Sequence, residues 1–372
     1  MTPFGLAAPT RILFGRGEFA KAVDLAAFLG PHAFVVHGAT PRHATALLDA
    51  PGLEATGFAC PIEPDLALLE TALDIARQAR ATHVVAIGGG AAIDLGKAVA
   101  GLLNAKTSPV DHLEVVGRGQ PLTTPPAPFM AIPTTAGTGA EATKNAVIGV
   151  PDHARKVSLR DAAMLADIAL VDPALTDNTP KSVTLASGLD AVTQVIEPYV
   201  SSRANPLTDA LCRAAIPRGL RALRKLMEGE NADARDDMAF VSLTGGLALA
   251  NAGLGAVHGL AGVIGGRVPT APHGAVCGAL LPATLAANFT ALPKDSPHAR
   301  RIAEIRVRAS EALGTADIAA WSRHHGLPTL AQMGVAPADH AAIATEAQSS
   351  SSMAANPVEL PVEVLQGILA AS

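Results

Sequence analysis

The sequence is poor in aromatic residues, cysteine and charge, and each scarcity narrows the classes of protein to which it can belong. Aromatic residues make up 3% of the 372 positions, with one tryptophan and one tyrosine. The three cysteines lie far apart and match no CxxC spacing, which argues for a reducing compartment and against a disulfide framework. Charged residues make up 16%, with a net charge of −5, so no broad basic surface is expected and nucleic acid is not predicted as a partner.

Targeting and membrane signals are also missing. The stretch MTPFGLAAPTRILFG has no basic region followed by a long apolar run, so we expect no secretory signal and a cytoplasmic location. The most apolar stretch, Met238–Val263, contains Asn251, six glycines and His258. Such a stretch is more typical of a buried core helix than of a membrane span, and no membrane partner is expected.

The chain does have the length and apolar content for two cores, because 372 residues exceed one ordinary domain and 49% are hydrophobic. In the first half, apolar runs at Ala33–His37, His83–Ile87 and Phe129–Ile132 alternate with helical patterns such as Pro64–Arg80. This alternation predicts parallel strands with crossover helices. From Thr179-Pro180, expected as helix N-cap and first helical residue, the pattern is helical without a convincing strand. We therefore predict an α/β domain over residues 1–179 and an all-helical domain over 180–372.

A glycine-rich junction follows one of the predicted strands. In HVVAIGGGAAIDLGKAVA, residues 83–100, an apolar run leads into Gly88, Gly89 and Gly90, and a helical pattern begins at once. Glycines allow a backbone to approach a phosphate, and a helix N-terminus supplies amide donors and a favourable dipole. The spacing is not GxGxxG, so a plain strand-to-helix turn remains the alternative.

A second loop, IPTTAGTGAEATKNAVI at residues 132–148, also leaves a predicted strand. Its hydroxyl groups, on Thr134, Thr135 and Thr138, suit a ribose or a pyrophosphate. Alone, it reads equally well as an ordinary surface loop. Two such loops after successive strands indicate one ligand across the carboxyl edge of the sheet.

A third group of residues lies in the helical half. His258 is expected to end an apolar helix, and His273 follows fifteen residues later in a Pro-His-Gly turn. Each histidine alone is more often a core or turn residue than a ligand. Together with Asp190 they form a plausible Asp/His/His set for a divalent transition metal. Gln194 lies one helical turn after Asp190 and projects from the same face.

The order of these motifs resembles the iron-containing (group III) alcohol dehydrogenase family, which includes a maleylacetate reductase-like branch. The motifs are GGGxxxDxxK, PTTAGTGAE, GLDA, a histidine before GLA, and PHG, and the resemblance extends over nearly the whole chain. It implies an N-terminal Rossmann-like domain and an all-helical C-terminal domain, the architecture shared with dehydroquinate synthase. It also implies a dimer or larger homo-oligomer and hydride transfer between NAD(P) and a small alcohol or aldehyde, usually on Fe²⁺ or Zn²⁺.

Carried over position by position, the resemblance implies specific site residues. The metal ligands would be Asp190, His258 and His273, which also form the catalytic group together with Gln194. The cofactor contacts would be Gly88, Gly89, Gly90, Asp94, Lys97, Thr134, Thr135, Thr138, Lys156 and Leu175.

Two positions depart from the family pattern. The usual second histidine ligand is Gln194, and a histidine often assigned to proton relay is Gly262. An amide oxygen is a weaker ligand than imidazole for late transition metals, so Fe²⁺, Zn²⁺ and the absence of a metal all stay open. NAD-preferring members place an acid where this chain has Gly38, so no carboxylate repels a 2′-phosphate there and NADP is expected to be tolerated as well as NAD.

The predicted function is therefore a metal- and NAD(P)-dependent oxidoreductase that interconverts a small alcohol and its aldehyde or ketone. One alternative is a maleylacetate reductase-like reduction of an activated keto acid, which need not use a metal. Two further alternatives are a dehydroquinate synthase-like lyase, which would cause no net NAD(P)H change, and a degenerate nucleotide-binding protein without turnover.

Overall fold

The computed structural model describes residues 3–372 and divides them into two compact units. The α/β unit comprises Ala7–Thr135 and Gly139–Thr176, and the helical unit comprises residues 3–6, Ala136–Thr138 and Asp177–Ser372. The main division therefore falls three residues before the boundary expected at 179/180. The short Ala136–Thr138 segment belongs to the helical unit, although its sequence lies within the threonine-rich loop.

A six-stranded parallel sheet forms the centre of the α/β unit, in the order β1-β8-β5-β4-β2-β3. This confirms the predicted α/β class and its parallel strands. The strands are β1 (Arg11–Phe14), β2 (His32–His37), β3 (Glu54–Ala59), β4 (His83–Gly88), β5 (Phe129–Pro133) and β8 (Ile168–Val171).

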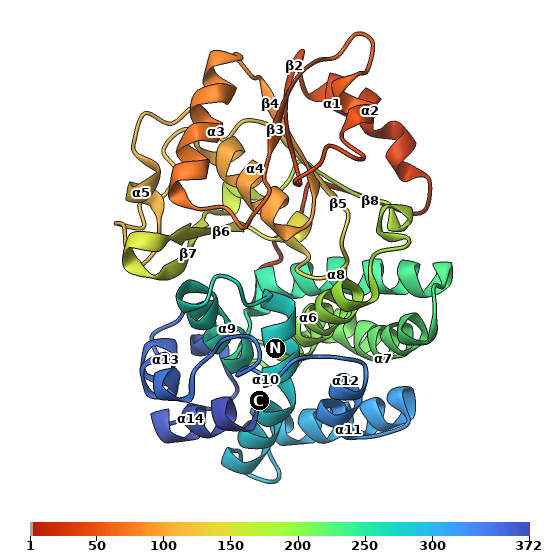
Figure 1. Ribbon diagram of the computed structural model, residues 1–372, viewed down its shortest axis with the longest axis vertical. Helices are drawn as coiled ribbons and strands as arrows, with labels where there is room; N and C mark the ends of the chain where they lie inside the picture. Colours follow the sequence, from red (N-terminus) through yellow and green to blue (C-terminus); the bar gives the residue numbers. More distant parts are fainter. Residues whose placement is uncertain (1–2) are drawn as a thin grey trace. The chain divides into compact units, whose positions relative to one another are not determined.

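Both faces of this sheet are covered, and the strand sequences show why. In β4, Val84 and Ala86 pack into the core beneath α3 (Leu66–Gln78) and α4 (Gly90–Leu102). The alternate residues, Val85 and Ile87, pack into a second core with α1 (Ala22–Leu29) and α2 (Thr45–Leu48). Figure 1 shows these two pairs of helices on opposite sides of the sheet. A strand buried on both faces is a continuous apolar run, as observed.

The remaining elements of this unit are short, and the sequence did not predict its hairpin. Strands β6 (Asn145–Val150) and β7 (Arg155–Arg160) pair as an antiparallel ribbon. The charged sequence of β7, RKVSLR, gave no strand signal. The others are α5 (Pro109–His112), η1 (Glu18–Lys21), η2 (Ala140–Ala142), η3 (Pro151–His153), η4 (Ala162–Met164) and η5 (Pro173–Thr176).

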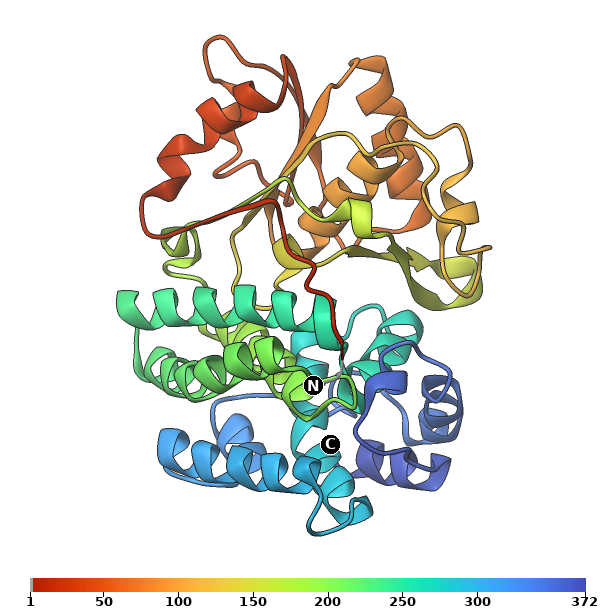
Figure 2. The ribbon, with the colours of Figure 1, turned by 180° about the vertical axis from the view of Figure 1, so that it is seen from behind.

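Within its described residues, the helical unit contains helices and no strand, as predicted. Figures 1 and 2 show α6, α7 and α8 (greens) packed along one another, with α10 beside α6. The helices are α6 (Lys181–Val200), α7 (Pro206–Glu228), α8 (Ala232–Ala252), α9 (Ala256–Arg267), α10 (His273–Ala291), α11 (Pro297–Leu313), α12 (Ile318–His324), η6 (Pro337–Asp339), α13 (His340–Ala347), η7 (Met353–Ala355) and α14 (Val362–Ala371).

Two sequence expectations about these helices were wrong. The stretch Met238–Val263 is not one helix, because α8 ends before Gly253, whose φ is +71°, and α9 continues at an angle of 100°. His258 therefore lies in the first turn of α9 rather than at the end of an apolar helix. The start of α6 is also displaced by one residue, since Pro180 is the N-cap and no side chain caps the helix.

The apolar character of α10 comes from the core of this unit. Among the described residues it is the one unbroken helix long and apolar enough to cross a membrane, and half of that window is buried inside the unit. Leu280, Leu281 and Leu285 belong to the helical core cluster. Burial against other helices thus accounts for its composition.

Candidate metal centre and nucleotide site

Two glycines bring α10 close to α6, the helix that carries Asp190. A Cβ on Gly274 would press into the backbone carbonyl of Ala186, and one on Gly278 would lie 2.6 Å from Leu189 Cδ1. Neither clash can be relieved without moving a helix or repacking a core side chain. The close approach therefore places the first turn of α10, which begins at His273, directly beside Asp190.

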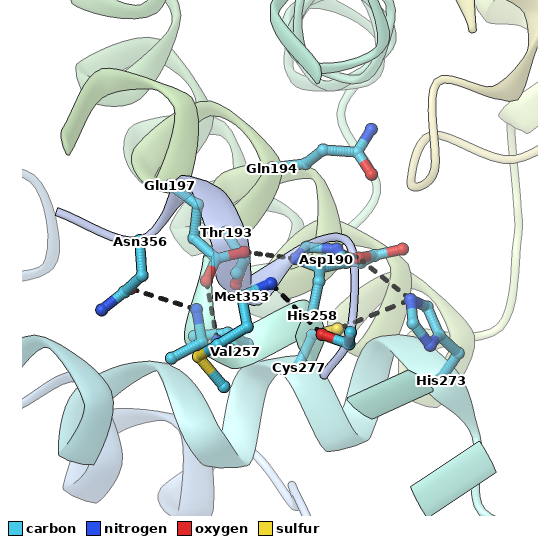
Figure 3. Close-up of polar contacts among 12 residues, drawn as sticks. Asp190, Thr193, Gln194, Glu197, Val257, His258, His273, Cys277, Met353 and Asn356 are labelled. Atoms are coloured by element: carbon cyan, nitrogen blue, oxygen red, sulfur yellow. Dashed lines mark hydrogen bonds and ion pairs between the residues drawn. The ribbon is translucent and has the colours of Figure 1, made fainter. Parts of the chain in front are cut away.

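Four side chains meet at this junction: Asp190, His258, His273 and Cys277. One ligand atom from each lies within 4.8 Å of all the others, and Figure 3 shows the group converging from α6, α9 and α10. His258 Nε2 is 3.4 Å and His273 Nε2 is 4.0 Å from Asp190 Oδ1. Cys277 Sγ is 3.6 Å from His273 Nε2. The structure thus brings together the three members of the predicted Asp/His/His set, and their binding of a metal stays a prediction.

Glu197 lies two turns after Asp190 on the same face of α6 and fixes the orientation of His258. Its Oε2 accepts a 2.6 Å hydrogen bond from His258 Nδ1, and its Oε1 accepts one from the Val257 backbone N–H at 2.7 Å. Gly255 permits this, because a Cβ there would lie 2.8 Å from Glu197 Oε1. In the form that would bind a metal, with the proton on Nδ1 alone, the lone pair of Nε2 faces the cluster, an arrangement typical of metal-ligating histidines.

Two buried polar atoms at the centre of the cluster have no hydrogen-bond partner: Asp190 Oδ1 and His258 Nε2. Their side chains are 2% and 6% exposed, so water does not freely satisfy them. An unpaired buried carboxylate oxygen costs free energy unless a cation or donor meets it. The donor set and its orphaned atoms therefore fit a divalent transition metal.

The electrostatics of the cluster favour positive charge at its centre. Although burial opposes ionisation, the nearby imidazoles of His258 and His273 hold the pKa of Asp190 below its usual range. The neighbouring Cys277 side chain, against the opposing effect of burial, raises the pKa of His273 to about 9. Burial also opposes protonation of His258, but Cys277, Asp190 and Glu197 raise its pKa well above the ordinary value.

Gln194 occupies the position where the family resemblance implies a histidine ligand, and its amide has another partner. Nε2 donates a hydrogen bond to the Thr138 carbonyl, and the side chain packs where a Cβ on Gly245 would touch it. Figure 3 shows no hydrogen bond between Gln194 and the four-residue cluster. The opposite atom, Oε1, keeps its lone pairs, so a role for Gln194 in the metal shell stays a prediction.

The glycine-rich junction lies at the topological switch point of the parallel sheet. β2 and β4 are neighbours, but the chain leaves β2 toward β3 on one side and β4 toward β5 on the other. A Cβ on Gly88 would lie 2.8 Å from Ala92 Cβ and 3.5 Å from the Gly38 backbone nitrogen. Ligands of open α/β sheets bind at such a point, outside the carboxyl ends of the strands.

The start of α4 at this edge carries no side-chain cap. Gly89 is the N-cap, Gly90 is the first helical residue, and no side chain accepts from the first turn. Thr134 follows β5 and donates its backbone N–H to the Gly88 carbonyl at 2.8 Å, and Thr135 Oγ1 would be 3.4 Å from a Cβ on Gly89. Open helix amides beside a hydroxyl fit a nucleotide pyrophosphate.

Other sequence candidates in this unit have structural partners of their own. Asp94 Oδ2 accepts from the Val147 N–H at 3.1 Å, and Lys97 Nζ is fully buried among the carbonyls of Ala140, Thr143 and Asn145. These contacts brace α4 against the loop after β5 and against β6. Thr138, by contrast, belongs to the helical unit, so the three threonines of the loop do not share one unit.

Lys156 and Leu175 also have structural partners within the α/β unit. Lys156, on β7, forms an ion pair with Glu63. Leu175 lies in η5 after the end of β8 and is buried in the core that contains α1 and α2. Their cofactor roles stay predictions.

The sequence reasoning missed Glu197 and Cys277, although both carried a spacing signal. Glu197 is seven residues after Asp190, which places the two on one face of a helix. Cys277 is one turn after His273, a His-x-x-x-Cys spacing that presents both side chains together. A CxxC pattern, the usual cysteine signal for a metal site, is absent around Cys277.

Two family models together match almost the whole chain. Residues 9–173 match the model for iron-containing alcohol dehydrogenase, and residues 184–372 match the C-terminal model of the Fe-containing alcohol dehydrogenase family. The two matches correspond closely to the α/β and helical units.

Individual relatives and solved structures agree with this match. Long-chain-alcohol dehydrogenase 1 of Geobacillus thermodenitrificans is 42% identical over 59% of this chain, which spans only 55% of that protein. Lactaldehyde reductase of Escherichia coli is 32% identical over 84% of each chain. The crystal structure of a 1,3-propanediol oxidoreductase superimposes with a TM-score of 0.88 at 27% identity over 99% of each chain.

Proposed function

The chain belongs to the iron-containing alcohol dehydrogenase family, and from this premise we propose that it is a metal-dependent, NAD(P)-linked oxidoreductase. Its substrates would be a small alcohol and the corresponding aldehyde or ketone. The observation that carries the proposal is the convergence of Asp190, His258 and His273, with two buried donor atoms that lack a partner. The names of the relatives, which include a lactaldehyde reductase and alcohol dehydrogenases, support the substrate class.

Asp190, His258 and His273 would hold the metal, with Gln194 Oε1 as a further candidate donor. A bound Fe²⁺ or Zn²⁺ supplies a Lewis acid that polarises the substrate oxygen. Glu197 keeps His258 in the tautomer that presents Nε2, and the buried Asp190 holds its charge toward the same point. The His273 side chain is one third exposed, so the substrate would reach the site from its side.

Gly88, Gly89, Gly90, Thr134 and Thr135 would receive the pyrophosphate of NAD or NADP, which supplies or accepts the hydride. We propose further contacts to the cofactor, which the family resemblance implies, from Thr138, Asp94, Lys156 and Leu175. Lys97 contributes indirectly, because its buried ammonium holds the loops beside α4. Gly38 offers no carboxylate against a 2′-phosphate, and no heavy atom lies within 4 Å of a Cβ built there. We therefore propose that the site accepts NADP as well as NAD.

Oxidation of NADH and NADPH by purified, metal-loaded protein with a panel of small aldehydes tests this proposal. His258→Ala should lose both the tightly held metal and turnover. His324→Ala, an exposed histidine on α12 of the same unit, should keep both. Full activity in His258→Ala would overturn the metal-dependent function, and activity that survives chelation would favour metal-free reduction of an activated keto acid.

The assembly is proposed on the family resemblance, and the location and partners on the composition and signals of the sequence. We propose a homodimer or larger homo-oligomer in the cytoplasm, with a small molecule as substrate and no nucleic-acid or membrane partner. Sedimentation of the purified chain measures the first of these directly, and a monomer at micromolar concentration would contradict it.

A further inference from the structure

Cys277 lies where a metal ligand would be expected from the geometry of α10. It follows His273 by one helical turn, so both side chains leave the helix on the same face. Its sulfur is 3.6 Å from His273 Nε2 and within 4.8 Å of the donor atoms of Asp190 and His258. The residue is fully buried, and Figure 3 shows the sulfur directed into the cluster.

The other donors leave room for one more ligand. Gln194 replaces an imidazole, and its Nε2 is already committed to the Thr138 carbonyl. Asp190 Oδ1 and His258 Nε2 are buried, have no hydrogen-bond partner and lie 3.4 Å apart. Two nitrogens, one carboxylate oxygen and one sulfur therefore surround a single point, and each comes from a side chain held in place by helix packing.

We propose that Cys277 is a thiolate ligand of the metal and takes the place of the imidazole that position 194 lacks. The proposal rests on the metal site of the proposed function and specifies its chemistry. A two-nitrogen, one-oxygen, one-sulfur donor set is softer than one of nitrogen and oxygen alone. Such a set favours Zn²⁺ over Fe²⁺ and Mg²⁺.

Binding is an exchange of a proton for the metal, without any change of oxidation state. The S–H bond of Cys277 breaks, the sulfur keeps the electron pair and donates it to the metal, and the proton passes to solvent. The site opens to solvent at the partly exposed His273, which gives the proton a short route out. Neither an oxidant nor a co-reactant is required.

Cobalt substitution tests the ligand directly, because a thiolate bound to Co²⁺ gives an intense near-ultraviolet charge-transfer band that oxygen and nitrogen ligands do not. Chelated protein would be reloaded with one equivalent of Co²⁺ and its absorption recorded without cofactor or substrate. We expect the band in the wild-type chain. Cys277→Ser should lack the band, and Cys212→Ser should keep it, since Cys212 is an equally buried thiol in the core of the same unit.

Zinc affinity gives a second readout. Loss of a direct ligand should weaken Zn²⁺ binding by at least about 100-fold in Cys277→Ser, beyond the 10–100-fold typical of an outer-shell change. Competition with a colorimetric chelator measures this, and Cys212→Ser is the matched control. The Fe²⁺ affinity of Cys277→Ser should fall far less, so the ratio of Zn²⁺ affinity to Fe²⁺ affinity should be smaller than in the wild-type chain.

The possible outcomes separate this proposal from the proposed function. One Co²⁺ per chain without the band, the same band in Cys277→Ser, or loss of the band in Cys212→Ser would overturn the thiolate ligand while leaving a metal-dependent reductase intact. Failure to retain any metal would overturn both. A band that depends on Cys277, in a protein that reduces no aldehyde, would support the ligand and refute the activity. If Cys277→Ser does not fold, the wild-type spectrum alone decides.

Discussion

Glu197 touches no reacting group in the proposed mechanism, yet it determines which nitrogen His258 presents. The carboxylate accepts from His258 Nδ1 at 2.6 Å and from the Val257 N–H at 2.7 Å. One carboxylate oxygen therefore caps the first turn of α9, and the other fixes the imidazole of His258. Both interactions are buried, so water cannot replace the carboxylate if it is removed.

The first residue-scale prediction is that Glu197→Gln lowers zinc affinity by roughly 10–100-fold. The amide keeps one acceptor oxygen, but its NH₂ group cannot accept the Nδ1 proton. Chelator competition measures the change. Glu304→Gln is the control. Glu304 also accepts a partly buried hydrogen bond, from Tyr199 Oη at 2.7 Å, but it does not belong to the metal cluster. Equal zinc affinity in wild type and Glu197→Gln would refute the orienting role.

The second residue-scale prediction concerns the pH dependence of stability and rests on Glu141, a buried carboxyl near Lys97. Burial raises the pKa of Glu141 from its ordinary 4.5 to about 7, despite its backbone hydrogen bond and Lys97. A raised carboxyl pKa means that the folded state binds more protons than the unfolded state between these values. Folding stability from this group is therefore complete below about pH 4.5 and is lost as the pH rises through 7.

Glu141→Gln should remove this pH dependence. The free energy of unfolding of wild type, relative to the variant, should fall by about 3 kcal/mol between pH 4.5 and pH 7.5, from 1.36 kcal/mol per pKa unit. Urea denaturation followed by far-ultraviolet circular dichroism at several pH values measures it. A constant difference across this range would show that Glu141 does not titrate as described.

Site residues could be predicted from the sequence where a short local motif contains them, and not where they act through contacts between distant helices. Asp190, His258 and His273 were found because each belongs to a recognisable short motif. Cys277 and Glu197 act through contacts that join α6, α9 and α10, and the helical spacing alone did not show which face would point inward. The partner of Gln194, a backbone carbonyl 56 residues earlier, could not be inferred from any local pattern.

Among elements, the contact between α6 and α10 positions the metal cluster. Gly274 and Gly278 are one turn apart and both lie against α6. Glycine normally weakens a helix interior by roughly 0.5–1 kcal/mol relative to alanine, so its presence here reflects the need for close packing.

Gly274→Ala should therefore weaken metal binding and lower the free energy of unfolding by about 1–3 kcal/mol, because overpacking forces α10 away from Asp190. Gly367→Ala is the control, since it also lies within a helix but has no heavy atom within 4 Å of its built Cβ. That control should be neutral or slightly stabilising. Denaturation and zinc titration measure both effects, and unchanged metal binding in Gly274→Ala would contradict the argument.

The elements themselves were predicted where their periodicity was strong. β2, β4 and β5 agree with the apolar runs to within one residue, because strands buried on both faces leave a clear sequence signal. The break between α8 and α9 was missed because apolar helical composition continues through Gly253 and Gly255. The β6–β7 ribbon was missed because both strands are only partly buried and β7 is charged.

For the whole molecule, the two units have separate cores and separate tasks in the proposed function. The glycine edge lies in the α/β unit and the metal cluster in the helical unit. The single tryptophan, Trp321, and the single tyrosine, Tyr199, both lie in the helical unit. Their fluorescence therefore reports on the unit that contains the metal cluster.

Zinc should raise the thermal unfolding midpoint measured by tryptophan fluorescence. At a free concentration of 100 times Kd, binding to the folded state adds about 2.7 kcal/mol of stability. His258→Ala should show almost no such shift, and His324→Ala should respond as wild type does. Equal stabilisation of wild type and His258→Ala would place the zinc elsewhere on the chain.

Metal-dependent hydride transfer is tested most directly by titrating chelated protein with Zn²⁺ and with Fe²⁺ while following NAD(P)H oxidation by a small aldehyde. The account predicts no turnover without metal and a linear rise that reaches its plateau at one equivalent per chain. Full turnover by the metal-free protein, or a plateau unrelated to one ion per chain, would contradict it.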